Sequence, residues 1–308
     1  TDKSGKHYGG LTGGQIAGRI VEDEIGVACA EREPDLIEAE WLLERIGAKF
    51  MDTFAQLGIH NDVDPFATAQ FAAQLVLALI GKERVRFIVV GDCGLRLNGN
   101  EVIQSTFALD VVCATVRKVV WNHLTRNGAD QKTANDVARA YTVAGLRGVH
   151  PKSGELVSAE ELGRIREEIL AEVSAALPEI SGADIVEAMA GGVAAQHRYA
   201  NRIHPLGFST VNGRPVPRSM ITSIDRKLSE IETIELFSDG YFGLPEGSDI
   251  ADWEDWIAMV EAEDPSKLGR FSSTKGSVGR CLTDDRTVLI IRCQNEHAVL
   301  QPEEASSR

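Results

Sequence analysis

Two hairpin patterns in direct succession constrain the fold of this chain more than any other feature. An apolar run at residues 71–80 and a β-branched run at residues 85–90 are separated by a short polar turn. A second pair of strand patterns follows, joined by Asn98-Gly99, which is a strong signal for a two-residue hairpin turn. We therefore predict four antiparallel strands in a row, ending near residue 103.

Helical periodicity flanks these hairpins on both sides. Before them, apolar residues recur at helical intervals from residue 16 toward residue 30, and again over residues 38–57, where Gly58 marks the end of the pattern. After them, four more helical patterns lie at residues 109–124, 134–146, 159–177 and 183–199. The middle of the chain is therefore expected to be mostly helical.

Strand patterns return in the last third of the chain. They lie at residues 208–211, 220–224, 233–237 and 287–291, with a turn at Asn212-Gly213 and one more helix at residues 253–262. Hairpins occur in groups and helices lie at the ends, whereas a Rossmann fold would alternate strand and helix. The pattern favours an α+β fold in which antiparallel sheets are covered by helices.

The domain organisation follows from this pattern and from the chain length. A chain of 308 residues is long enough for one large core, and no internal repeat divides it. We predict a single domain over residues 1–298 with a helical insert at about 107–200. The polar residues 299–308 are expected to form a flexible tail.

Charge and composition exclude several classes of function. The formal net charge is −14, and nucleic-acid binding requires clustered Lys and Arg, so we expect no nucleic-acid partner. No apolar run approaches the roughly 18 residues that a membrane helix needs, so no membrane partner is expected. The five cysteines form no C-x-x-C pair, which favours a reduced, cytoplasmic location. The oligomeric state stays open.

Three aspartates stand directly beside predicted strands. Asp92 and Asp239 each follow a strand pattern, and Asp284 shortly precedes the last one. A single aspartate at such a position is often only a turn residue. Three of them at the ends of rigid strands predict a site, and carboxylate oxygens are ligands that Mg²⁺ and Mn²⁺ prefer.

The strings around these aspartates resemble the metal-dependent protein phosphatases of type 2C. That family has a strand ending in Ser-Asp-Gly, a later Asp-x-x-Thr that leads into the last strand, and a central hairpin with Val-Gly-Asp-Ser or Val-Gly-Asp-Cys. This chain has, in the family's order, Val90-Gly91-Asp92-Cys93, Ser238-Asp239-Gly240 and Asp284-Asp285-Arg286-Thr287. The resemblance covers roughly residues 1–104 and 206–293.

The resemblance implies a fold, a reaction and a set of ligands. It implies a four-layer αββα sandwich and the hydrolysis of phosphoserine or phosphothreonine monoesters by water activated between two metal ions, Mg²⁺ or Mn²⁺. Asp239 would bind the central metal pair, Asp284 would bind one of the two ions, and Asp92 would help a third, weaker ion. The implied partner is a phosphorylated protein or a small phosphorylated substrate.

The start of the chain departs from the family and leaves alternatives open. Either Asp2 is the bridging ligand with His7 after it, or the bridging aspartate lies upstream of Thr1. We prefer the second interpretation, because Lys3 stands where the family needs glycine. Two rival functions are a catalytically degenerate regulatory or binding module and a hydrolase that uses Thr1 as an N-terminal nucleophile.

Overall fold

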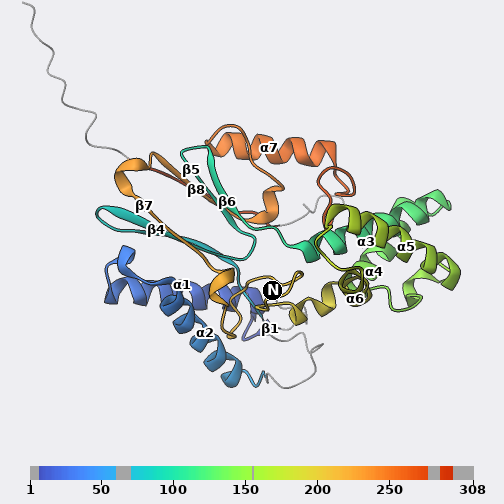
Figure 1. Cartoon of the computed structure of the whole chain (residues 1–308), viewed down its shortest axis with the longest axis horizontal. Helices are drawn as coiled ribbons and strands as arrows, with labels where there is room; N and C mark the ends of the chain where they lie inside the picture. Colours follow the sequence, from blue (N-terminus) through green and yellow to red (C-terminus); the bar gives the residue numbers. More distant parts are fainter. Residues whose placement is uncertain (1–6, 60–70, 155, 277–284, 294–308) are drawn as a thin grey trace, which may run out of the picture.

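The computed structural model describes residues 7–59, 71–154, 156–276 and 285–293, and Figure 1 shows the arrangement of its elements. Its helices are α1 (Gly13–Glu31), α2 (Ala39–Gln56), α3 (Ala108–Arg126), α4 (Gln131–Ala144), α5 (Ala159–Ala176), α6 (Gly182–Gly191) and α7 (Ile250–Glu263). Its strands are β1 (His7–Tyr8), β2 (Leu11–Thr12), β3 (Leu75–Ile80), β4 (Arg84–Val90), β5 (Gly94–Leu97), β6 (Glu101–Gln104), β7 (Thr222–Lys227), β8 (Thr233–Phe237) and β9 (Val288–Arg292). Within the described part, no helix is long and apolar enough to cross a membrane.

Two antiparallel sheets form the centre of the molecule. One has the strand order β3-β4-β7 and the other β6-β5-β8-β9. Alternate side chains of β4, namely Val85, Phe87 and Val89, form one buried cluster with Leu95 of β5 and Ile234 of β8. Because side chains two apart point to the same face of a strand, this cluster is the interior between the two sheets.

Helices cover the outer face of each sheet. The opposite face of β4, with Ile88 and Val90, packs in one cluster with α1 and α2, including Phe50. The outer face of β8 carries Phe237, which packs against Trp253 of α7, with ring centroids 5.2 Å apart. The order helix, sheet, sheet, helix confirms the predicted α+β sandwich of four layers (Figure 1).

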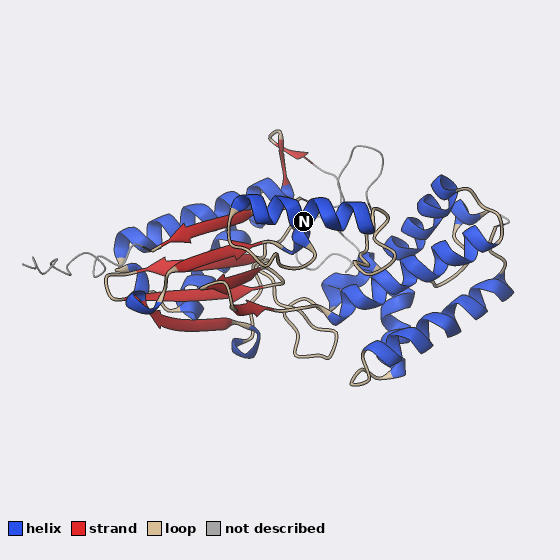
Figure 2. Cartoon of the chain, turned by 90° about the horizontal axis from the view of Figure 1, so that it is seen from above, coloured by secondary structure: helices blue, strands red, loops and turns tan. Residues whose placement is uncertain are grey.

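The four helices α3 to α6 form a group of their own beside the sheets (Figures 1 and 2). They share a hydrophobic cluster in which Val116 and Val120 of α3 meet Ile165 of α5 and Ile185 of α6. The helical content predicted for this part of the chain is therefore present. The assignment of the whole block as an insert within a single domain stays a prediction.

The last of the predicted helices in this group is shorter than the sequence indicates. The pattern extends from residue 183 to 199, but α6 ends at Gly191 and a 3-10 turn, Val193–Arg198, follows. Gly192 has φ of 57°, and a Cβ atom at this position would lie 2.6 Å from the carbonyl oxygen of Thr142. The apolar periodicity continues past Gly192, so the periodicity alone does not predict where the helix ends.

The strand predicted at residues 208–211 is wrong. This segment makes only isolated bridges, from Val211 to Ala73 and from Phe208 to Ala200. Ser209 does not extend a sheet but accepts a hydrogen bond at Oγ from the backbone N–H of Gly91, at 3.0 Å. The next strand, β7, begins at residue 222, two residues later than predicted.

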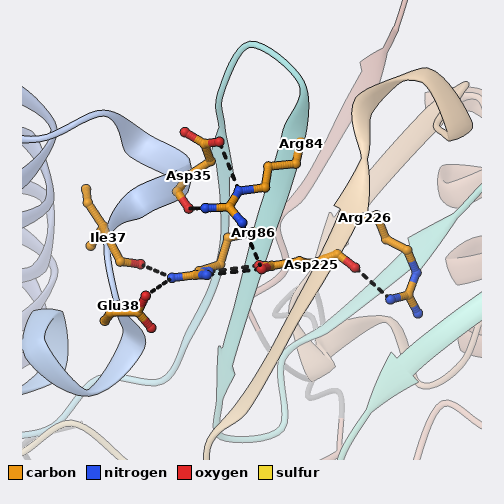
Figure 3. Close-up of polar contacts among 7 residues, drawn as sticks. All are labelled: Asp35, Ile37, Glu38, Arg84, Arg86, Asp225 and Arg226. Carbon is orange, nitrogen blue, oxygen red and sulfur yellow. Dashed lines mark hydrogen bonds and ion pairs between the residues drawn. The ribbon is translucent and has the colours of Figure 1, made fainter.

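A network of charged side chains fixes the first sheet to the segment between α1 and α2 (Figure 3). Arg86 is buried on β4, and its guanidinium donates to both carboxylate oxygens of Asp225 on β7, at 2.8 and 3.0 Å, and to the carbonyl oxygen of Ile37 at 3.0 Å. Arg84 donates to the carboxylate of Asp35 at 3.1 Å. The hydrogen bonds from Arg86 lower the pKa of Asp225, so this carboxylate stays ionised at neutral pH.

A buried ion pair fixes α7 to the other sheet. Arg96 of β5 and Glu235 of β8 are register partners, and Nε of Arg96 donates to Oε1 of Glu235 at 2.9 Å. The indole N–H of Trp253 donates to the other oxygen of Glu235 at 2.9 Å. Arg96 also donates to the carbonyl oxygens of Pro245 and Gly247, at 2.5 and 2.6 Å. The loop after Asp239 is thereby held against the sheet.

Candidate functional site

Strand register brings Asp92 and Asp239 to the same end of the sandwich. The chain leaves β4 at residue 90, crosses from one sheet to the other through Gly91, Asp92 and Cys93, and enters β5 at Gly94. Gly94 pairs with Phe237, the last residue of β8. Asp92 precedes Gly94 by two residues, and Asp239 follows Phe237 by two. Both aspartates therefore lie just beyond the same end of the paired strands β5 and β8.

A third carboxylate, that of Asp110, lies at this end of the strands and belongs to a helix. Gly94 also pairs with Gln104, the last residue of β6, so the chain leaves the sheet at the same end and then begins α3. Asp110 lies in the first turn of α3. Asp110 was not predicted from the sequence, because this residue follows no predicted strand directly and matches none of the three motifs.

The three carboxylates line one cavity of about 510 Å³. Polar side chains of Gln74 and Gln104 line it as well, and Phe107 and Phe208 form an apolar part of its wall. Their rings lie 5.0 Å apart between centroids. Residues 272–275 are also part of the lining. The cavity therefore combines a cluster of negative charge with an apolar wall.

Asp92 is buried close to the charges of two other carboxylates. The side chain is 9% exposed, and Oδ1 is buried with no hydrogen-bond partner among the described residues. Burial, and then the charges of Asp239 and Asp110, raise the pKa of Asp92 to about 7, against a smaller opposing effect from hydrogen bonds that include Gln74. A divalent cation would remove the repulsion and give Oδ1 a partner, and carboxylate oxygens are donors of the kind that Mg²⁺ and Mn²⁺ prefer.

The turn that carries Asp92 is held by specific backbone geometry. Gly91 has φ of 105°, and a Cβ atom there would lie 2.4 Å from Cγ of Gln74, so only glycine fits. Its N–H donates to Ser209, and the carbonyl oxygen of Asp92 accepts a hydrogen bond from the side-chain amide of Gln104 at 3.1 Å. These contacts fix the position of the carboxylate before any ligand binds.

The turn that carries Asp239 is packed against the segment that leads into β9. Ser238 donates its N–H to the carbonyl oxygen of Thr287 and accepts the N–H of Thr287 at Oγ, both at 3.0 Å. A Cβ atom at Gly240 would lie 2.4 Å from the carbonyl oxygen of Asp285. The glycine of the Ser-Asp-Gly string is therefore required by the close approach of the Asp285 backbone.

Two of the three predicted metal ligands, Asp92 and Asp239, lie within the described residues and line the same cavity. Asp284, Asp2 and Thr1 lie outside the described residues. Within residues 7–59, 71–154, 156–276 and 285–293, no group of three His, Cys, Asp or Glu side chains is close enough to hold a metal ion by itself. The roles assigned to these aspartates stay predictions.

Comparisons with known proteins give only distant likenesses. No protein-family model matches the chain, and no curated protein matches it. Among solved structures, a bacterial serine phosphatase is 15% identical with a TM-score of 0.38, over 94% of this chain and 84% of that chain. Serine/threonine phosphatase Stp1 from Staphylococcus aureus is 14% identical with a TM-score of 0.40, over 94% of this chain and 81% of that chain. Identities and TM-scores this low assign no function to the chain.

Proposed function

We propose that this protein is a metal-dependent phosphatase that hydrolyses phosphoserine and phosphothreonine monoesters. The observation that carries the proposal is the convergence of Asp92, Asp110 and Asp239 on one cavity, where a buried carboxylate oxygen of Asp92 has no partner among the described residues. A site built from carboxylates without cations would repel an anionic substrate. With divalent cations it becomes a site for phosphate.

Asp239 and Asp284 would hold the principal Mg²⁺ or Mn²⁺ ions, and Asp92 and Asp110 would hold a further, weaker ion. Asp110 joins this set because its charge acts on Asp92 across the cavity. When bound, such cations lower the pKa of water and neutralise charge on a phosphoryl group.

The residues of the chain would position and protect the reacting groups. Gln104 and Ser209 fix the turn of Asp92 through its backbone, so its carboxylate needs little reorganisation when a ligand binds. The pKa of about 7 means that the Asp92 carboxyl group exchanges a proton near neutral pH in the protein without metal. Phe107 and Phe208 would exclude water from one side of the substrate.

The decisive experiment replaces Asp239 by Asn. We expect turnover of p-nitrophenyl phosphate and of a phosphothreonine peptide in saturating Mn²⁺ to fall by about two orders of magnitude or more, because an amide cannot supply the charge of a ligand carboxylate. Calorimetry should show weaker Mn²⁺ binding, and circular dichroism should show an unchanged fold. The matched control is Asp255→Asn on the exposed face of α7, which should behave like the wild type.

Three outcomes separate this function from its rivals. Near-wild-type turnover in the Asp239→Asn variant would refute the ligand assignment. Absence of Mn²⁺ binding and of turnover in the wild type would favour a regulatory or binding module. Amide hydrolysis that survives chelation and is lost in a Thr1→Ala variant would favour the N-terminal nucleophile mechanism.

A further inference from the structure

The described lining of the cavity contains a single positive charge. Asp92, Asp110 and Asp239 contribute three carboxylates, and Lys275 is the one cationic side chain among the described residues that line the same space. A phosphate monoester carries nearly two negative charges at neutral pH, since its second pKa is about 6. Positive charge in the cavity, in addition to that of metal ions, would favour the binding of such a substrate.

Lys275 belongs to a loop of defined shape, residues 264–276. The carboxylate of Asp264, which is 8% exposed, accepts hydrogen bonds from three backbone N–H groups of this loop, at 2.9 to 3.1 Å. A carboxylate that satisfies several backbone donors fixes a loop in one conformation. The position of Lys275 at the cavity is therefore set by the fold.

A buried arginine of α3 anchors the same loop from the other side. Nη1 of Arg117 donates to the carbonyl oxygens of Ser266 at 2.8 Å, Lys267 at 3.1 Å and Ser273 at 3.3 Å. Burial lowers the pKa of Arg117 to about 10, which still leaves the guanidinium charged at neutral pH. A Cβ atom at Gly276 would lie 2.4 Å from Nη2 of Arg117, so this end of the loop also packs closely on the arginine.

Helix α3 thus contributes one residue to the cavity lining and one that anchors the loop. Asp110 and Arg117 are seven residues apart on α3, which is about two helical turns, so they lie on the same face of the helix. Asp110 lines the cavity together with Asp92 and Asp239, and Arg117 holds the loop that carries Lys275. Ser273 and Thr274 of this loop are half-buried and add hydroxyl groups to the lining.

From this arrangement we propose that Lys275, with the hydroxyl groups of Ser273 and Thr274, forms a subsite that binds the phosphoryl oxygens of the substrate. The inference rests on the proposed function and assigns the recognition of the phosphate group to a named loop. Lysine binds phosphate as a compact point charge, and hydroxyl groups donate the additional hydrogen bonds. Lys275 is a binding residue in this proposal and needs no role as a metal ligand.

The test measures binding of inorganic phosphate by calorimetry in saturating Mg²⁺, together with kinetics on p-nitrophenyl phosphate. Loss of one charge-assisted hydrogen bond should weaken phosphate binding about tenfold or more in Lys275→Ala. KM should rise by a similar factor while kcat changes less, because the contact is made in both ground state and transition state. Lys275→Arg should restore most of the affinity, since it keeps the charge.

Lys82→Ala is the matched control, because Lys82 is an exposed lysine in the turn between β3 and β4 and its side chain is 87% exposed. It should leave both constants unchanged. Wild-type phosphate affinity in Lys275→Ala, or no phosphate binding by the wild type, would overturn the subsite. If the wild type binds phosphate but has no turnover, the proposed function falls, and the ratio of the two phosphate affinities still decides the role of Lys275.

Discussion

Replacing Asp92 by Asn is expected to stabilise the metal-free protein, and to do so more strongly as the pH rises. Burial and the charges of Asp239 and Asp110 raise the pKa of Asp92 from its ordinary value of 3.8 to about 7. The unfolded chain loses this proton near pH 4, whereas the folded protein keeps it until about pH 7, so the folded state loses stability over this interval. At about 1.4 kcal/mol per pKa unit, roughly three units correspond to about 4 kcal/mol for the complete transition. Asparagine has no proton to lose and avoids this penalty.

Urea denaturation in the presence of a chelator, between pH 5 and pH 8, measures this effect. The difference in free energy of unfolding between Asp92→Asn and the wild type should grow by about 3 kcal/mol over this range. Asp23→Asn, at an exposed position of α1, is the control and should show no such growth. Saturating Mn²⁺ should remove the advantage of the variant, because the cation screens the carboxylates. A difference that is independent of pH would refute the reasoning.

The remaining predictions concern the buried ion pair and the turn after Asp239. Glu235→Gln should lower the free energy of unfolding by about 3–5 kcal/mol in urea denaturation, because it leaves Arg96 buried without a charged partner. A combined replacement of Arg96 and Glu235 by Met and Leu should recover part of this loss, and no recovery would show that the pair itself is net stabilising. Gly240→Ala should weaken Mn²⁺ binding in calorimetry, because its Cβ would lie 2.4 Å from the carbonyl oxygen of Asp285. Gly26→Ala, where nothing lies within 4 Å of the added atom, is the control, and equal Mn²⁺ affinity in the two variants would contradict this prediction.

Elements that pack apolar side chains into a core were predictable from the sequence, and a segment held by side chains was not. The helical pattern at residues 38–57 corresponds to α2, and the strand pattern at residues 233–237 corresponds to β8, because their apolar spacing reflects the core that they cover. Residues 208–211 also have strand composition. Their backbone, however, bonds to the side chain of Asn201, which accepts the N–H of Thr210 at Oδ1 and donates to its carbonyl oxygen. No alternation rule detects such a partner nine residues away.

The buried ion pair was missed for a related reason. Leu95-Arg96-Leu97 alternates in the way that predicts one buried face and one solvent face. In a sandwich of four layers the outer face of each sheet is buried as well, here under α7. A charged residue on that face is stable only because Arg96 and Glu235 are direct register partners, a fact that depends on the pairing of strands far apart in the sequence.

The candidate site was predictable where a motif marks it, and Asp110 shows what strand register adds. Asp92 and Asp239 were found because each follows a strand and stands in a recognisable string. Asp110 has neither property, yet the tight turn at Asn98-Gly99 returns the chain to the edge from which β5 started. Strands β5 and β6 are both four residues long, so β6 ends beside the start of β5. A carboxylate in the first turn of the helix that follows is therefore expected near Asp92. The β5–β6 hairpin returns the chain to the end of β5 next to Asp92. It thereby locates a third carboxylate that composition and motifs do not reveal.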